Sequence, residues 1–120
     1  MAKILIVDDD ILITGLMQTL VAMSGHDAII VNDSIEAMET AISVKPDLIT
    51  LDLMMPGLSG YDLCQLLRAD QRFDQTPIVI ISAKEDTKSR EKALKMEATE
   101  YLTKPFDIDH FLKMIQKYTG

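Results

Sequence analysis

Polar side chains that could share one reactive site stand where short apolar runs of this chain stop. Three runs end on carboxylates or on a hydroxyl, and a fourth ends on an ammonium group. Clustered carboxylates suit a hard divalent cation, a lone carboxylate can act as a nucleophile, and hydroxyl and ammonium groups can neutralise a phosphoryl group. In chain order, the polar residues at the four ends are Asp8-Asp9-Asp10, Asp52, Ser82 and Lys104.

The apolar runs have the length and composition of buried parallel strands. They are Ile4–Val7, Leu48–Leu51, Ile78–Ile81 and Tyr101–Thr103, and Ala28–Val31 adds a fifth strand. Helical patterns separate the runs, which predicts five strand–helix units. Residues that can cap the helix starts support this division, and they are Asp10, Asp33, Ser59 and Asp107.

The strand order follows from the continuity of the runs. The runs that begin at Ile4, Leu48 and Ile78 are the most continuous, so we place them in the centre of the sheet, where both faces are covered. Right-handed crossovers then favour the order 2-1-3-4-5, which is a flavodoxin-like α/β fold, a doubly wound parallel sheet of (βα)5 type. The first and third strands are neighbours in this order, so Asp8 and Asp9 should face Asp52.

Length, composition and charge exclude several classes of protein. A chain of 120 residues suits one domain over residues 1–120, and the single cysteine, Cys64, excludes an internal disulfide. The formal net charge of −7 argues against nucleic acid as a direct partner. The N-terminus lacks the features of a signal peptide, and no apolar stretch approaches the ~18–20 residues of a membrane span. We therefore expect a cytoplasmic protein without a membrane segment.

Three carboxylates at one sheet edge repel each other unless a proton or a cation lies among them. Aspartate oxygens suit Mg²⁺, which uses few protein ligands and keeps several waters. Asp52 stands alone after its run, so one of its oxygens would be free to act as a nucleophile. Lys104 would give an incoming phosphoryl group a positive charge, and Ser82 would give it a hydroxyl donor.

Four motifs, in their order and spacing, resemble those of the receiver domains of two-component response regulators, the family of the bacterial chemotaxis regulator. The resemblance implies a phosphoacceptor in signal transduction, not an enzyme, that takes a phosphoryl group from a sensor histidine kinase or a phosphotransfer protein and then controls a protein partner. The motifs span essentially the whole chain and are Ile4–Asp10 (ILIVDDD), Asp52–Gly60 (DLMMPGLSG), Ile80–Ala83 (IISA) and Tyr101–Phe106 (YLTKPF).

The resemblance also implies a role for each matching acidic residue. Asp52 would accept the phosphoryl group. Asp8 and Asp9 would hold Mg²⁺, or alternatively Mn²⁺, together with Asp52 and the backbone carbonyl of Met54.

The remaining matches imply how the signal leaves the site. Lys104 and Ser82 would contact the phosphoryl group, and the Lys104–Pro105 peptide bond would be cis. Movement of Ser82 would let Tyr101 swing between exposed and buried positions. The output would be a change in the surface of the fourth helix, fifth strand and fifth helix, in a monomer or a weak dimer formed on phosphorylation.

Some positions depart from the family pattern or carry separate expectations. Glu97 stands where the family usually has glycine, so it must tolerate or avoid a left-handed backbone. Met54 and Lys84 should overhang the phosphoryl group, and we hypothesise that Met54 shields it from water.

In the second helix we expect a buried stripe of Ile35, Met38 and Ile42. We expect His26 and His110 at the surface.

Other functions remain open on the sequence alone. Asp8-x-Asp10 after an apolar strand echoes the haloacid-dehalogenase phosphatases, although the chain leaves no room for their cap domain. A flavodoxin-like cofactor carrier would need a phosphate-binding first loop, which Asp8-Asp9-Asp10 would oppose. A pseudo-receiver would bind partners without phosphate. The chain could be a stand-alone regulator or a receiver from a longer regulator or hybrid kinase.

Overall fold

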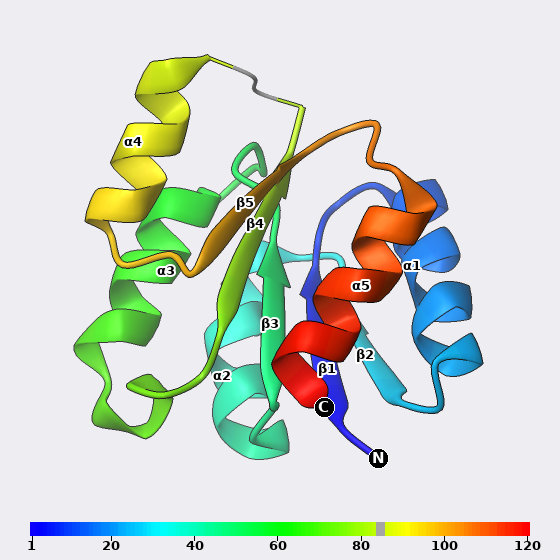
Figure 1. Ribbon diagram of the computed structural model, residues 1–120. Helices are drawn as coiled ribbons and strands as arrows, with labels where there is room; N and C mark the ends of the chain where they lie inside the picture. Colours follow the sequence, from blue (N-terminus) through cyan, green and yellow to red (C-terminus); the bar gives the residue numbers. More distant parts are fainter. Residues whose placement is uncertain (84–85) are drawn as a thin grey trace.

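The computed structural model describes residues 1–83 and 86–120, in which five strands alternate with five α-helices (Figure 1). Lys84, which we expected over the site, lies outside the described residues. The strands are β1 (Lys3–Val7), β2 (Asp27–Val31), β3 (Leu48–Leu51), β4 (Ile78–Ser82) and β5 (Glu100–Thr103). The helices are α1 (Ile11–Met23), α2 (Ser34–Val44), α3 (Gly60–Ala69), α4 (Thr87–Lys95) and α5 (Ile108–Thr119), and a 3₁₀ turn, η1 (Gln71–Phe73), follows α3.

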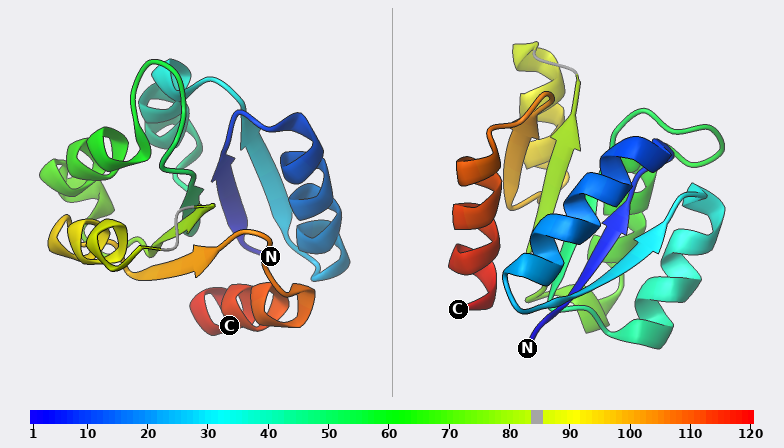
Figure 2. Two further views of the ribbon diagram at one scale, coloured as in Figure 1. Left: turned by 90° about the horizontal axis from the view of Figure 1, so that it is seen from above. Right: turned by 90° about the vertical axis from the view of Figure 1, so that its right-hand side faces the viewer.

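The strands of the described chain form one parallel sheet in the order β2-β1-β3-β4-β5, which confirms the predicted fold. Val7 of β1 lies opposite Leu51 of β3, and Leu51 lies opposite Ile80 of β4. The ends of the central strands are therefore level, and the residues that follow them meet at one edge of the sheet. Helices α1 and α5 cover one face, and α2, α3 and α4 cover the other (Figure 2).

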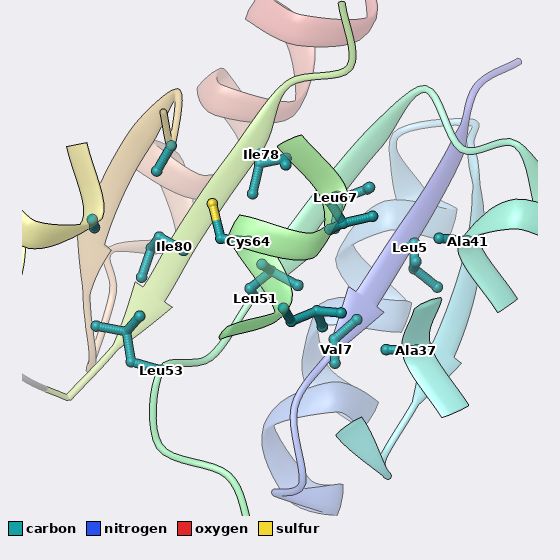
Figure 3. Close-up of a cluster of buried hydrophobic side chains, with 14 of the residues drawn as sticks. Leu5, Val7, Ala37, Ala41, Leu51, Leu53, Cys64, Leu67, Ile78 and Ile80 are labelled. Atoms are coloured by element: carbon teal, nitrogen blue, oxygen red, sulfur yellow. The ribbon is translucent and has the colours of Figure 1, made fainter. Parts of the chain in front are cut away.

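Both faces of the central strands are buried, which explains their continuous apolar sequences. In β1, Ile4 and Ile6 pack in the cluster formed with α1 and α5, whereas Leu5 and Val7 pack toward α2 (Figure 3). Burial of each such side chain contributes about 1.5–3 kcal/mol to folding. This packing gives the carboxyl edge of the sheet a rigid support.

The four predicted helix caps are confirmed. Each accepts a hydrogen bond from a backbone N–H in the first turn of its helix, which satisfies a donor that has no partner inside the helix. Asp10 caps α1, Asp33 caps α2, Ser59 caps α3 and Asp107 caps α5.

The predicted buried stripe of α2 is wrong at Ile35, whose side chain is exposed. The buried positions of α2 are small and are Ser34, Ala37 and Ala41. The hydroxyl of Ser34 donates to the Pro56 carbonyl at 2.8 Å and accepts from the Leu58 N–H at 3.0 Å. These bonds turn Ser34 toward the β3–α3 loop, and the next residue, Ile35, consequently faces solvent.

Two further features bear on the expectations from sequence. His26 is partly buried, and its Nδ1 atom accepts a hydrogen bond from the Ala2 N–H at 2.9 Å, whereas His110 is exposed as expected. Among the described residues, no helix is both long enough and apolar enough to cross a lipid bilayer.

The buried hydroxyl of Thr50 on β3 has no hydrogen-bond partner among the described residues. Burying an unpaired hydroxyl costs about 1–3 kcal/mol, so Thr50→Val should raise the free energy of unfolding by about 1 kcal/mol. Thr14 is a matched control, because its equally buried Oγ1 donates to the Ile11 carbonyl at 3.1 Å and accepts from Asn32 at 3.2 Å. Thr14→Val should lower stability in the same urea titration, and equal losses in both variants would contradict this prediction.

Candidate functional site

Three carboxylates meet at the carboxyl edge of the sheet, as the strand order predicts. Asp8, Asp9 and Asp52 each offer an oxygen atom within 4.8 Å of the others. Asp8 and Asp52 are buried, whereas Asp9 is exposed to solvent. The site therefore has two fixed acidic groups and one that faces outward.

Backbone pairing beyond the regular strands fixes the two buried carboxylates. The Asp52 N–H donates to the Val7 carbonyl at 3.0 Å, and the Asp8 N–H donates to the Val31 carbonyl at 3.1 Å. Both aspartates thus extend the sheet by one residue. Their side chains point from neighbouring strands into the region where the strand order reverses.

Lys104 brings a positive charge into this cluster from the far side of β4. Its Nζ atom lies 2.6 Å from Asp8 Oδ2 and 3.5 Å from Asp52 Oδ2. The Lys104 N–H donates to the Ser82 carbonyl at 2.8 Å, which anchors its backbone beside the end of β4. The Lys104–Pro105 peptide bond is cis, as the family resemblance implies.

Burial and neighbouring charges shift the pKa values of Asp52 and Lys104. Burial of the carboxylate, and then the Asp8 charge, raise the pKa of Asp52, although Lys104 and a backbone hydrogen bond from Met54 oppose the shift. Burial lowers the pKa of Lys104, but its hydrogen bond to Asp8 and the nearby carboxylates outweigh this effect, so the pKa is raised. The site thus holds a charged ammonium beside an Asp52 anion that its surroundings stabilise poorly, which favours nucleophilic reactivity.

The backbone around Asp52 is tightly packed against the start of α3, and the nearby Met54 side chain is exposed. A Cβ atom at Gly60 would lie 2.2 Å from the Asp52 carbonyl oxygen, so the first turn of α3 can approach the strand end only with glycine there. Met54 donates its N–H to Asp52 Oδ1 at 3.4 Å, and its side chain is 59 % exposed. Met54 therefore lies beside the Asp52 carboxylate, with its side chain exposed to solvent.

Ser82 and Tyr101 lie on neighbouring strands, β4 and β5. Ser82 is fully buried, and Tyr101 is 9 % exposed. A side-chain hydrogen bond joins the two residues, and burial, the largest cause, raises the pKa of Tyr101. The hydroxyl expected to contact a phosphoryl group is thus in direct contact with the aromatic residue expected to switch.

Sequence reasoning missed a residue that supports the acidic cluster. Asn32, which sequence analysis did not assign to the site, donates from Nδ2 to the Asp8 backbone carbonyl at 2.8 Å and to Thr14 Oγ1 at 3.2 Å. Asp8 Oδ1 also accepts the Asp10 N–H at 2.9 Å. Asn32 directly follows β2, which is next to β1 in the sheet, and this position is the signal that could have indicated the contact between Asn32 and Asp8.

Glu97, the departure from the family glycine, adopts a left-handed backbone with φ of 66°. The Arg68 side chain of α3 donates to the Glu97 carbonyl at 2.9 Å and to the Phe73 carbonyl at 2.6 Å. These hydrogen bonds hold the turn in a conformation that costs a non-glycine residue energy. The departure changes how the α4–β5 turn is stabilised and leaves the acidic cluster unaffected.

Residues 4–116 match the response regulator receiver domain family. The chain is a receiver domain of two-component response regulators. The DNA-binding transcriptional regulator RpaA of Synechocystis is 36 % identical over 97 % of this receiver domain and 48 % of RpaA. The domain thus spans about half the length of the curated relatives that it matches.

Solved structures agree with this assignment. The chemotaxis protein CheY4 of Vibrio cholerae has a TM-score of 0.92 and 28 % identity, with 98 % of each chain covered. The receiver domain of the sensor histidine kinase PA1611 of Pseudomonas aeruginosa has a TM-score of 0.89 and 26 % identity, and covers 98 % of this chain and 96 % of its own. That structure has a magnesium ion coordinated in the active-site cleft.

The donor set of this receiver domain fits a divalent cation. Asp8, Asp9 and Asp52 offer oxygen atoms, which hard cations prefer, and these atoms are close enough for one ion to bind them together. The exposed side of Asp9 leaves space for waters. The cluster can therefore hold a cation of the Mg²⁺ type.

The raised pKa of Asp52 predicts a pH-dependent stability. The folded chain binds this proton more tightly than the unfolded chain, so the stabilisation is present below the ordinary pKa of 3.8 and is lost as the pH rises through the folded pKa. Ionised Asp52 consequently destabilises the fold at neutral pH. Asp52→Asn should raise the free energy of unfolding at pH 7 by about 1 kcal/mol.

Urea titrations between pH 7 and pH 4 measure this effect, and the gain from Asp52→Asn should shrink toward the acidic end. Glu39→Gln is the control, since it removes one negative charge from an exposed position on α2. An equal gain in the control would assign the effect to net charge, against the local cause proposed for Asp52.

Proposed function

We propose that Asp52 accepts a phosphoryl group from a phosphohistidine of a sensor histidine kinase or a phosphotransfer protein. One observation carries the proposal: the buried Asp52 carboxylate lies beside Asp8 and 3.5 Å from the Lys104 ammonium. Phosphoryl transfer depends mainly on positioning and on neutralisation of charge. A rigid acceptor with a fixed counter-charge meets both demands.

In the proposed transfer, an Asp52 oxygen attacks the phosphorus atom of the phosphohistidine. The new O–P bond forms as the N–P bond breaks, and the bonding electron pair returns to the imidazole nitrogen, which then takes a proton from water. Lys104 would contact one phosphoryl oxygen, and the Ser82 hydroxyl would donate to another. The phosphoryl group stays on the chain until water removes it, so we regard the protein as a phosphoacceptor and not as an enzyme.

A divalent cation, Mg²⁺ or alternatively Mn²⁺, would neutralise phosphoryl charge when bound. We assign its protein ligands to the carboxylates of Asp8, Asp9 and Asp52 and to the backbone carbonyl of Met54. Asn32 and Asp10 would orient Asp8 through the hydrogen bonds described above. This assignment rests on the donor chemistry of the cluster.

The proposed output is a change in the surface formed by α4, β5 and α5, which Ser82 and Tyr101 would trigger. We expect this surface to control a protein partner in the cytoplasm, with the domain a monomer or a weak dimer formed on phosphorylation. Direct contact with nucleic acid is not expected for this receiver domain, because its net charge is −7. RpaA is itself a DNA-binding regulator, so the domain could serve alone or within a longer regulator.

Labelling with acetyl phosphate tests the proposal. With Mg²⁺ present, intact-mass spectrometry should detect one added phosphoryl group, and omission of the cation should abolish it. Asp52→Asn should remain unlabelled, whereas the control Glu39→Gln should be labelled like the parent chain.

Other outcomes of this experiment support the rival functions. Continued hydrolysis of phosphomonoesters that depends on Asp8 would favour a phosphatase. Absence of any label, with partner binding unchanged in Asp52→Ala, would favour a pseudo-receiver.

Met54 should lengthen the life of the phosphoryl group, because its exposed apolar side chain stands beside Asp52 and would hinder approach of water. Met54→Asn replaces this side chain with one that can bind water, and it should shorten the lifetime several-fold. The measurement is loss of the label after removal of acetyl phosphate, with Met23→Asn on α1 as a control at an exposed methionine. An unchanged or longer lifetime in Met54→Asn would contradict the shielding role.

A further inference from the structure

One guanidinium group on α4 contacts two residues of β5. Arg90 Cζ lies 4.8 Å from the centre of the Tyr101 ring, and Arg90 Nη2 donates to Thr103 Oγ1 at 2.6 Å. Tyr101 and Thr103 are two positions apart on the strand, so they share one face of the sheet. Arg90 therefore lies along this face, with one contact to the ring and a second to the strand.

The Tyr101 ring is nearly covered although β5 is an edge strand of the sheet. The Tyr101 side chain forms a hydrogen bond with the Ser82 side chain. Arg90 contributes to the outer cover, and it comes from a helix whose surface belongs to the proposed output face. The ring thus has Ser82 on one side and α4 on the other.

We propose that Arg90 is a positioning residue that holds Tyr101 in its inward position and links that position to α4. The proposal deepens the proposed function, because Ser82 is the residue that would contact the phosphoryl group. For the ring to turn outward, Arg90 must leave the ring and either release Thr103 or stretch away from it. A partner at the output face therefore meets Arg90 lying over the ring in one state and an exposed tyrosine in the other.

The size of the effect follows from the strength of one cation–π contact. At a partly exposed site, such a contact corresponds to about a two- to fivefold change in an equilibrium constant. Arg90→Ala should therefore raise the ratio of outward to inward Tyr101 by about this factor. Arg90→Lys keeps the positive charge but loses the planar fork, so its effect should be smaller.

The chain offers a matched control on the same helix. Lys92 Nζ lies 4.3 Å from the centre of the Tyr61 ring, so Lys92→Ala removes a comparable cation–π contact of α4 without touching Tyr101. The readout is NMR of ring-labelled tyrosine, with Tyr101→Phe to assign the signal and a neutral paramagnetic agent to report solvent exposure. Exposure of Tyr101 should rise in Arg90→Ala and stay unchanged in Lys92→Ala.

The phenol titration gives a second readout of opposite sign for the two interpretations. Burial is the largest cause that raises the pKa of Tyr101, whereas the Arg90 charge lowers it. If Arg90 holds the ring inward, Arg90→Ala lets water reach the ring and the pKa falls toward its ordinary value. If Arg90 is only a nearby charge, the ring stays buried and its pKa rises further when the cation is removed.

A protected ring with a higher pKa in Arg90→Ala would overturn the proposal, as would equal exposure in Lys92→Ala. Circular dichroism of each variant excludes unfolding as the cause of exposure. These measurements use no phosphodonor, so they can fail while Asp52 is still labelled by acetyl phosphate. The reverse outcome, an exposed ring without labelling, would leave the role of Arg90 intact and refute the proposed phosphoacceptor.

Discussion

The repulsion between Asp8 and Asp52 is the constraint on which the rest of this receiver domain depends. Their carboxylates are buried on adjacent strands, and the Lys104 ammonium, 2.6 Å from one and 3.5 Å from the other, balances the charge. Lys104 follows β5, so it must reach across the end of β4, where the small, buried Ser82 leaves room. The repulsion between Asp8 and Asp52 is therefore balanced through three features together. These are the strand order, the small residue at position 82 and the lysine after β5.

The same contacts connect this charge balance to a distant surface. Ser82 accepts a backbone hydrogen bond from Lys104, and its side chain is hydrogen-bonded to Tyr101. The Tyr101 ring in turn contacts Arg90 of α4. Each link joins a different element, and each is short-ranged. These contacts form a continuous path from the strand ends to α4.

The fold was predictable where one residue pattern has one physical cause. Continuous apolar runs occur because β1, β3 and β4 are covered on both faces, and caps such as Ser59 occur because helix starts have unpaired donors. Contacts between distant segments were not predictable. The outward position of Ile35 depends on hydrogen bonds from Ser34 to a loop, and the cover that Arg90 gives to Tyr101 depends on how α4 packs against β5.

Mg²⁺ titration of Lys104→Met tests most directly whether the ammonium balances the carboxylates. If it does, Lys104 competes with the cation, and its removal should tighten Mg²⁺ binding about tenfold, the scale of one unit charge a few ångströms away in a partly solvated site. Lys113→Met, which removes the same charge from an exposed position of α5, should leave the affinity nearly unchanged. Unchanged or weaker binding in Lys104→Met would contradict the charge balance at the strand ends.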